Sequence, residues 1–75
     1  MDRTMIVEHL LQAESTVETG ERHVSRQRVI VQRLGDGGVD AIAARELLVC
    51  FENLQREHVA HRDWLAKELA ALEPG

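Results

Sequence analysis

A cluster of glycines near the middle of the chain constrains the fold more than any other feature. Residues 35–38 read Gly-Asp-Gly-Gly, and a long segment without proline lies on each side. Glycine readily adopts the left-handed backbone conformation that ends many helices. Both flanking segments are rich in Ala, Leu, Val, Glu, Arg and Gln, most of which favour helix. The sequence therefore predicts two long helices that fold back on each other at residues 35–39.

The expected boundaries place one domain over residues 1–75. We predict the first helix over about residues 3–34 and the second over about residues 41–72, ending before Pro74. Asp2 and Asp40 are the expected N-caps, because a carboxylate accepts hydrogen bonds from the free N–H groups of a first helical turn. A connection this short joins antiparallel neighbours. The predicted fold class is therefore all-α, a helical hairpin.

The first predicted helix carries a heptad pattern of apolar residues, spaced alternately by four and by three. Two positions in the pattern are not apolar. We interpret Gly20 as a point of close approach to the neighbouring helix, and Gln27 as a polar residue that fixes the register. The full stripe is Ile6, Leu10, Ala13, Val17, Gly20, Val24, Gln27, Val31 and Leu34.

The second predicted helix carries a similar stripe with a wider apolar face. Its flanks carry Leu48, Cys50 and Trp64. We interpret Cys50 as a small buried hydrophobe. A face this wide suits contact with more than one neighbour. Folding at the glycines predicts that Val17 lies opposite His58. The stripe consists of Ala44, Leu47, Phe51, Leu54, His58, His61, Leu65 and Leu72.

A hairpin of two helices has no third layer to close its core. Chains this short rarely bury enough apolar surface alone, and oligomerisation is a common remedy. The simplest closed arrangement is a two-fold homodimer of hairpins, an antiparallel four-helix bundle. The expected oligomer interface consists of Ile6, Leu10, Val17, Val24, Val31, Leu47, Phe51, Leu54, His58, His61, Trp64 and Leu65.

His58 and His61 are three residues apart and project from one helix face. In a two-fold dimer they would converge, with Glu57 or Glu14 nearby, and imidazole and carboxylate are zinc ligands. Three interpretations stay open: a small metal-binding bundle, polar residues satisfied within the seam, and an interface weakened by protonation. Di-iron bundles use Glu-x-x-His motifs instead. We therefore assign no metal ligand, cofactor or catalytic residue.

Composition excludes several classes of function. A single cysteine rules out an internal disulfide, and no segment approaches the roughly 20 apolar residues of a membrane span, which predicts a cytoplasmic protein without membrane contact. The net charge of −4 disfavours binding of nucleic acid through phosphates. His9 and His23 are expected to be solvated edge residues. A hairpin this thin offers no obvious pocket, so an enzyme using the histidines as acid–base groups is the least favoured class.

Two stretches resemble a known group of short proteins. Residues 20–28 read Gly-Glu-Arg-His-Val-Ser-Arg-Gln-Arg and residues 44–48 read Ala-Arg-Glu-Leu-Leu, followed by Phe51, Glu52, Gln55, His58 and Arg62. Together they resemble short, functionally uncharacterised α-helical hairpin proteins of rhizobia and related alphaproteobacteria. The resemblance implies a free-standing bacterial protein and assigns no site residues. The overall prediction is a homodimeric interaction module, not an enzyme, that binds itself and another protein in a structural or regulatory role.

Overall fold

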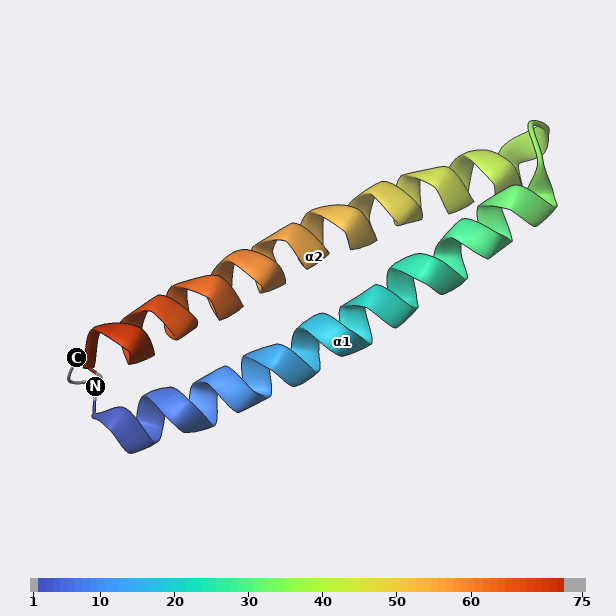
Figure 1. Ribbon diagram of the computed structural model, residues 1–75. Helices are drawn as coiled ribbons and strands as arrows, with labels where there is room; N and C mark the ends of the chain where they lie inside the picture. Colours follow the sequence, from blue (N-terminus) through green and yellow to red (C-terminus); the bar gives the residue numbers. More distant parts are fainter. Residues whose placement is uncertain (1, 73–75) are drawn as a thin grey trace.

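The computed structural model describes residues 2–72, which form a hairpin of two helices (Figure 1). Helix α1 spans Arg3–Leu34 and helix α2 spans Gly38–Leu72. The predicted all-α hairpin is thereby confirmed for the described residues, whereas Pro74 lies outside them. The molecule measures 56 × 18 × 14 Å. The start of α1 and the end of α2 lie together at the end opposite the turn (Figure 1).

Helix α1 is capped at both ends as the sequence predicts. The Asp2 carboxylate accepts a hydrogen bond from the Met5 N–H at 2.9 Å. At the other end, Gly35 has a φ of 68°, and its N–H donates to the Val31 carbonyl at 3.2 Å. An L-residue with a side chain rarely adopts that φ, so glycine is required there to end the helix and begin the turn.

Helix α2 begins at Gly38, earlier than the predicted start at residue 41. Only residues 35–37 therefore connect the helices. Asp40 lies inside the first turn of α2 rather than before it, where its negative charge still complements the helix dipole. The Arg45 guanidinium donates to the Gly35 carbonyl at 3.2 Å, which ties α2 to the turn.

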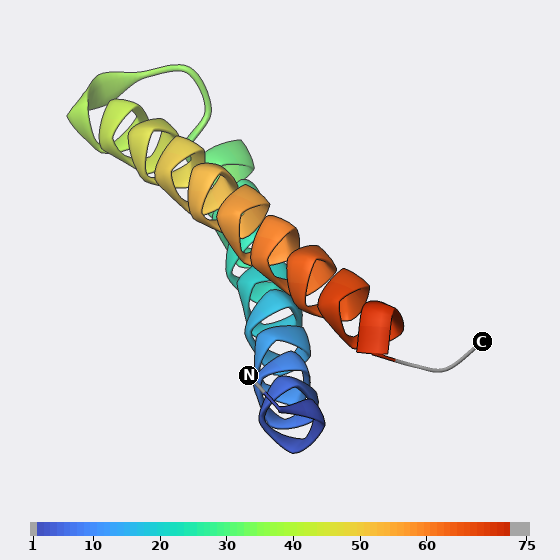
Figure 2. The same cartoon turned by 90° about the vertical axis from the view of Figure 1, so that its left-hand side faces the viewer.

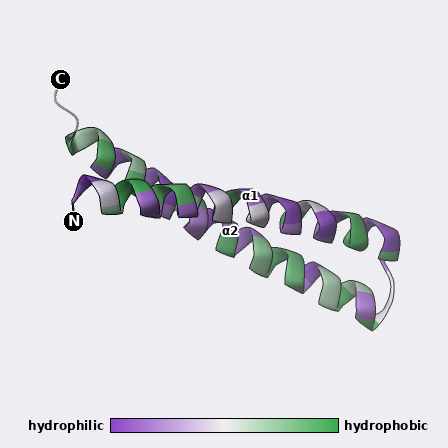
Figure 3. Cartoon of the chain, turned by 90° about the horizontal axis from the view of Figure 1, so that it is seen from below, coloured by the Kyte–Doolittle hydropathy of each residue, from purple (hydrophilic) through white to green (hydrophobic). Residues whose placement is uncertain are grey.

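The earlier start of α2 changes which residues meet across the hairpin. The Val17 carbonyl accepts a hydrogen bond from the Gln55 side chain at 2.7 Å, although the sequence predicted His58 opposite Val17. That prediction was wrong by about one helical turn, because it assumed a longer connection. The helices cross at a shallow angle, as the two perpendicular views show (Figures 2 and 3).

Few side chains are buried between the helices. Only Ile6 and Leu65 are large aliphatic residues, and Leu65 is the largest side chain of the described residues that is essentially inaccessible, at 1% exposure. The small residues permit close approach of the two backbones, but they bury little apolar area. The buried set consists of Ile6, Ala13, Val17, Val24, Gln27, Ala41, Ala44 and Leu65.

The surface of the hairpin is not uniformly polar. The half of α2 next to the turn is largely hydrophobic in the view of Figure 3, whereas the same half of α1 is mainly hydrophilic. Among residues 2–72, neither helix contains a stretch long and apolar enough to cross a membrane.

Candidate functional site

Two glutamines form hydrogen bonds across the seam, which is the line of contact between α1 and α2. The Gln27 amide donates to the Ala44 carbonyl at 2.9 Å, and the Gln55 amide donates to the Val17 carbonyl at 2.7 Å. Each side chain thus reaches from one helix to the backbone of the other. Gln27 is 6% exposed, which confirms its position as a polar residue within the seam. The two bonds lie at different heights of the hairpin and favour one register.

Gly20 provides the space that Gln55 needs. A Cβ atom at position 20 would overlap the amide end of the Gln55 side chain. The interpretation of Gly20 as a point of close approach is therefore confirmed. The Gln55 Oε1 atom is buried and has no hydrogen-bond partner among the described residues, so this contact is held by the amide nitrogen alone.

The residues predicted for an oligomer interface fall into two groups. Ile6, Val17, Val24 and Leu65 are buried within a single hairpin, and Leu10, Val31, Phe51 and His58 are half-buried there. They build the seam between α1 and α2. The other four remain exposed on the hairpin: Leu47, Leu54, His61 and Trp64.

The predicted inward stripe of α2 was wrong at Leu47, Leu54 and His61. Their places in the seam are taken by the next residue along the chain in each case, so the seam stripe is shifted by one position. The half-buried residues that replace them are Leu48, Gln55 and Arg62. This stripe was not recognised in the sequence because Gln55 and Arg62 are polar. The same heptad position also contains Ala41, Leu48 and Leu69.

Cys50 was also wrongly placed, because the structure leaves its side chain exposed rather than buried. Trp64 is 51% exposed and stacks on His61, with ring centroids 6.4 Å apart and an interplanar angle of 20°. An exposed tryptophan is a large apolar surface, and such residues are enriched in protein interfaces.

One side of the hairpin, termed here the histidine side, carries all four histidines of the chain. Two adjoining hollows of about 410 and 340 Å³ run along it and share Gln12, Thr16 and His58 in their walls. No Asp, Glu, Lys or Arg lines these hollows in the described part of the chain. The remaining wall residues are His9, Ala13, Ser15, Thr19, Gly20, His23 and His61.

Two heptad rows border the histidine side. A spacing of seven residues repeats a position on one helix face, so the residues of each row share the same side. The α1 row includes two of the histidines, and the α2 row includes the exposed leucines that the sequence had placed in the seam. The rows are His9, Thr16, His23 and Ile30 on α1, and Asp40, Leu47, Leu54, His61 and Glu68 on α2, whose two charged residues lie at the ends of the row.

The imidazole of His58 lies where the two hollows meet. Its Nδ1 atom is buried and has no hydrogen-bond partner among the described residues. His23 packs against Phe51 nearby, with ring centroids 5.9 Å apart. His9 and His23 are exposed, as expected for edge residues, but they line the same hollows as His58. Neither Glu14 nor Glu57 lines these hollows on the single hairpin; the carboxylate expected near the histidines in a two-fold dimer stays a prediction.

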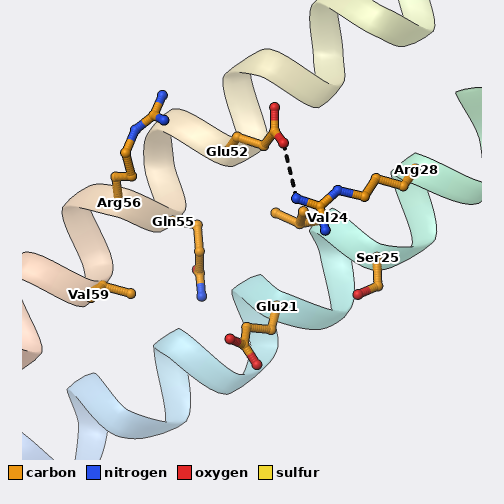
Figure 4. Close-up of a pocket in the computed structure, with 8 residues that line it drawn as sticks. All are labelled: Glu21, Val24, Ser25, Arg28, Glu52, Gln55, Arg56 and Val59. Atoms are coloured by element: carbon orange, nitrogen blue, oxygen red, sulfur yellow. Dashed lines mark hydrogen bonds and ion pairs between the residues drawn. The ribbon is translucent and has the colours of Figure 1, made fainter.

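The opposite side of the hairpin, termed the charged side, contains a groove of about 540 Å³ (Figure 4). Arg28 on α1 and Glu52 on α2 form an ion pair across it, at 3.1 Å. Arg56 points away from the groove and donates to Asn53 on its own helix. The remaining wall residues are Glu21, Val24, Ser25, Gln55 and Val59.

The heptad rows of the charged side carry formal charges at most positions. These rows flank the seam on one side, and the rows of the histidine side flank it on the other. The two sides therefore occupy equivalent positions beside the seam but carry different residue types. The rows are Val7, Glu14, Glu21 and Arg28 on α1, and Gly38, Arg45, Glu52, Val59 and Ala66 on α2.

No group of three or more His, Cys, Asp or Glu side chains in residues 2–72 is arranged to hold a metal ion. The described residues of one hairpin therefore do not supply a ligand set, even where His9, His58 and His61 line one hollow. Comparisons of the chain with protein-family models, with curated proteins and with solved structures found no match.

Proposed function

We propose that this chain is a homodimeric interaction module of the cytoplasm that forms an antiparallel four-helix bundle and binds a protein partner in a structural or regulatory role. It has no catalytic site of its own. The fold supplies two long helices with short connections, which is the geometry from which such bundles are built. What supports the proposal is the distribution of apolar residues.

The observation that carries the proposal is the imbalance between buried and exposed apolar side chains. Among the described residues only two large aliphatic side chains are buried, Ile6 on α1 and Leu65 on α2, and both lie towards the end of the hairpin opposite the turn. A much larger number of apolar residues stays in contact with solvent, and exposed apolar surface on this scale marks an interaction surface. The exposed residues are Met5, Leu11, Val29, Ile30, Leu34, Val39, Ile42, Leu47, Val49, Leu54, Trp64 and Leu72.

The shape of the hollows supports an interaction module over an enzyme. All three are surface furrows between two helices, and the molecule is only 14 Å across in its thinnest dimension. Small-molecule sites bury most of the ligand surface in a concave pocket. A furrow along a helical pair instead suits a further helix, which lays its side chains into the groove between its neighbours.

The proposal is tested by measuring the mass of the purified chain by light scattering and sedimentation equilibrium over a range of concentrations. A concentration-dependent dimer is expected. A folded monomer at every concentration contradicts the proposal. Affinity capture with the dimer as bait then identifies the protein partner.

The alternative proposal, a metal-binding bundle using His58 and His61, requires ligands from a second copy, because the described residues of one hairpin form no ligand set. Elemental analysis and a thermal melt with and without chelator separate the two proposals. Metal at a stoichiometric ratio and a lower melting temperature with chelator favour the alternative. A protein that contains no metal and has the same melting temperature with and without chelator favours the interaction module.

A further inference from the structure

We infer that a second copy of this chain docks on the histidine side of the hairpin, and that the charged side remains in solvent. The inference rests on the proposed self-association and assigns it to one surface. Three observations carry it: the amount of surface that the hairpin exposes, the distribution of formal charge between the two sides, and the position of the exposed apolar rows relative to the seam.

The exposed area of the hairpin matches what a second copy would cover. The chain of 8.5 kDa exposes 5628 Å², whereas a compact protein of that mass exposes about 4,700 Å². A compact protein of twice the mass exposes about 7,700 Å². Two hairpins packed to that standard would bury roughly 3,500 Å² between them, which lies within the 2,000–5,000 Å² range of obligate homodimers.

Charge selects the histidine side. In a two-fold contact the same surface patch occurs on both partners, so each group lies near copies of the groups around it. The hollows of the histidine side carry no Asp, Glu, Lys or Arg in their walls, and with neutral imidazoles they can meet their own copy without burying a formal charge. The groove of the charged side would bury Glu21, Arg28 and Glu52 from each chain, and desolvation of so many charges is costly.

The position of the apolar rows selects the same side. Leu47 and Leu54, which are 44% and 48% exposed, directly flank the seam on the histidine side and continue to His61 and Trp64. On the charged side the exposed Ile42 and Val49 do not adjoin the seam, because the row containing Arg45 and Glu52 lies between. The histidine side therefore offers the larger exposed apolar surface next to the seam, as the core of a four-helix bundle requires, since Val59 on the charged side is half-buried.

A pair of matched variants on α2 tests the assignment. Leu54→Glu places a charge on the histidine side, and Val49→Glu places one at a similarly exposed position on the other side, since the two residues are 48% and 54% exposed. Dimer dissociation constants are measured by sedimentation equilibrium, and circular dichroism verifies that each variant is helical. We expect Leu54→Glu to raise the dissociation constant at least about 30-fold, and Val49→Glu to leave it within about threefold.

A second variant on α1 keeps the test decisive if Leu54→Glu does not fold. Thr16→Glu introduces a charge at an exposed position in the wall of both hollows of the histidine side, and it is expected to weaken the dimer in the same way. Dimers with unchanged affinity for both Leu54→Glu and Thr16→Glu would overturn the assignment and leave the proposed dimer intact. So would dissociation caused by Val49→Glu alone. A wild-type chain that is monomeric throughout would overturn the proposed function itself.

Discussion

The histidine side and the charged side of the hairpin use the same two helices and the same heptad positions on either flank of the seam. On the charged side those positions carry carboxylates and guanidinium groups, and Arg28 pairs with Glu52 across the groove. On the histidine side they carry threonine, isoleucine, leucine and histidine over most of their length, with Asp40 and Glu68 at the two ends of the α2 row, and no Asp, Glu, Lys or Arg lines the described hollows. The heptad positions on the two flanks of the seam thus give one side whose charged groups are stabilised by water, and another side that a protein surface can cover.

The largest expected effect concerns Leu65, which belongs to the seam that both sides share. It is 1% exposed, so Leu65→Ala removes buried apolar surface and leaves a cavity. We expect the free energy of unfolding, measured by urea denaturation, to fall by about 2–5 kcal/mol. Val49→Ala is the matched control at a 54% exposed position, with an expected change below about 0.5 kcal/mol. Equal losses for the two variants would mean that the seam does not separate the sides as described.

Acidification is expected to act on the histidine side alone. Imidazole is the side chain that gains a charge between about pH 8 and 5, and the groups facing His58 are His9 and His23 on α1 and His61 on α2, without a lining carboxylate. A charged imidazole in the docked pair would be buried near copies of itself, so association is expected to be strongest at the higher pH and to be lost as pH falls. We expect the dimer dissociation constant to rise at least about tenfold between pH 8 and 5.5.

Two controls sharpen the pH prediction. Replacing all four histidines by Gln should remove most of the pH dependence while the chain remains helical. The net charge of −4 falls in magnitude on acidification, which favours association, but exposed charges more than about 8 Å apart are largely screened at physiological salt. A dissociation constant that stays the same over this pH range would contradict the prediction.

Gly20 and Gln55 allow the boundary between the two sides to be tested, because Gly20 lines the histidine side and Gln55 lines the charged side. Gly20→Ala displaces the Gln55 amide and its bond to Val17, at a cost of about 0.5–1.5 kcal/mol, which offsets the gain of about 1 kcal/mol from replacing a helical glycine. In a Gln55→Ala background the same change should stabilise by about 1 kcal/mol. Thermal melts of the four chains give the coupling energy, and a value near zero would show that the contact is absent.

The smallest expected effect belongs to the ion pair of the charged side. The Arg28 and Glu52 side chains are 58% and 36% exposed, so solvent screens their attraction. Arg28→Gln should lower the free energy of unfolding by less than about 1 kcal/mol. The difference from wild type should shrink further in 1 M salt, where the screening length is about 3 Å. A loss of several kcal/mol would instead mean that this side is buried in the assembly and that the comparison between the sides is reversed.

The helices and the α1 half of the seam could be predicted from the sequence, because the glycine cluster and the unbroken heptad pattern have few alternative interpretations. Gly20 and Gln27 were identified as exceptions with structural roles; the close approach at Gly20 and the seam position of Gln27 are confirmed. The α2 half could not be predicted as well. Gly38 is compatible with either a turn or a helix start, and the structure uses it as the first residue of α2. That ambiguity shifts the pairing of the helices by about one turn.

The histidine side depends on that pairing. His9 and His23 lie far from His58 and His61 in the sequence, and the pairing of the helices brings all four to one surface. The seam position of Gln55 was missed for a related reason. A polar residue can occupy a seam position only where the facing residue leaves room, and the sequence did not show that Gly20 would face it.

The start of α1 and the end of α2 both lie opposite the turn, so a label attached at that end of the hairpin reports how two hairpins are oriented in a dimer. The rod is 56 Å long, and Asp2 caps α1 at the far end from Gly35. In a dimer whose two-fold axis runs along the rod, spin labels attached at position 2 would be near neighbours. In a dimer whose axis crosses the rod, the labels would stand about one rod length apart. A single labelled position thus reads out whether the two turns of the assembly point the same way or in opposite directions.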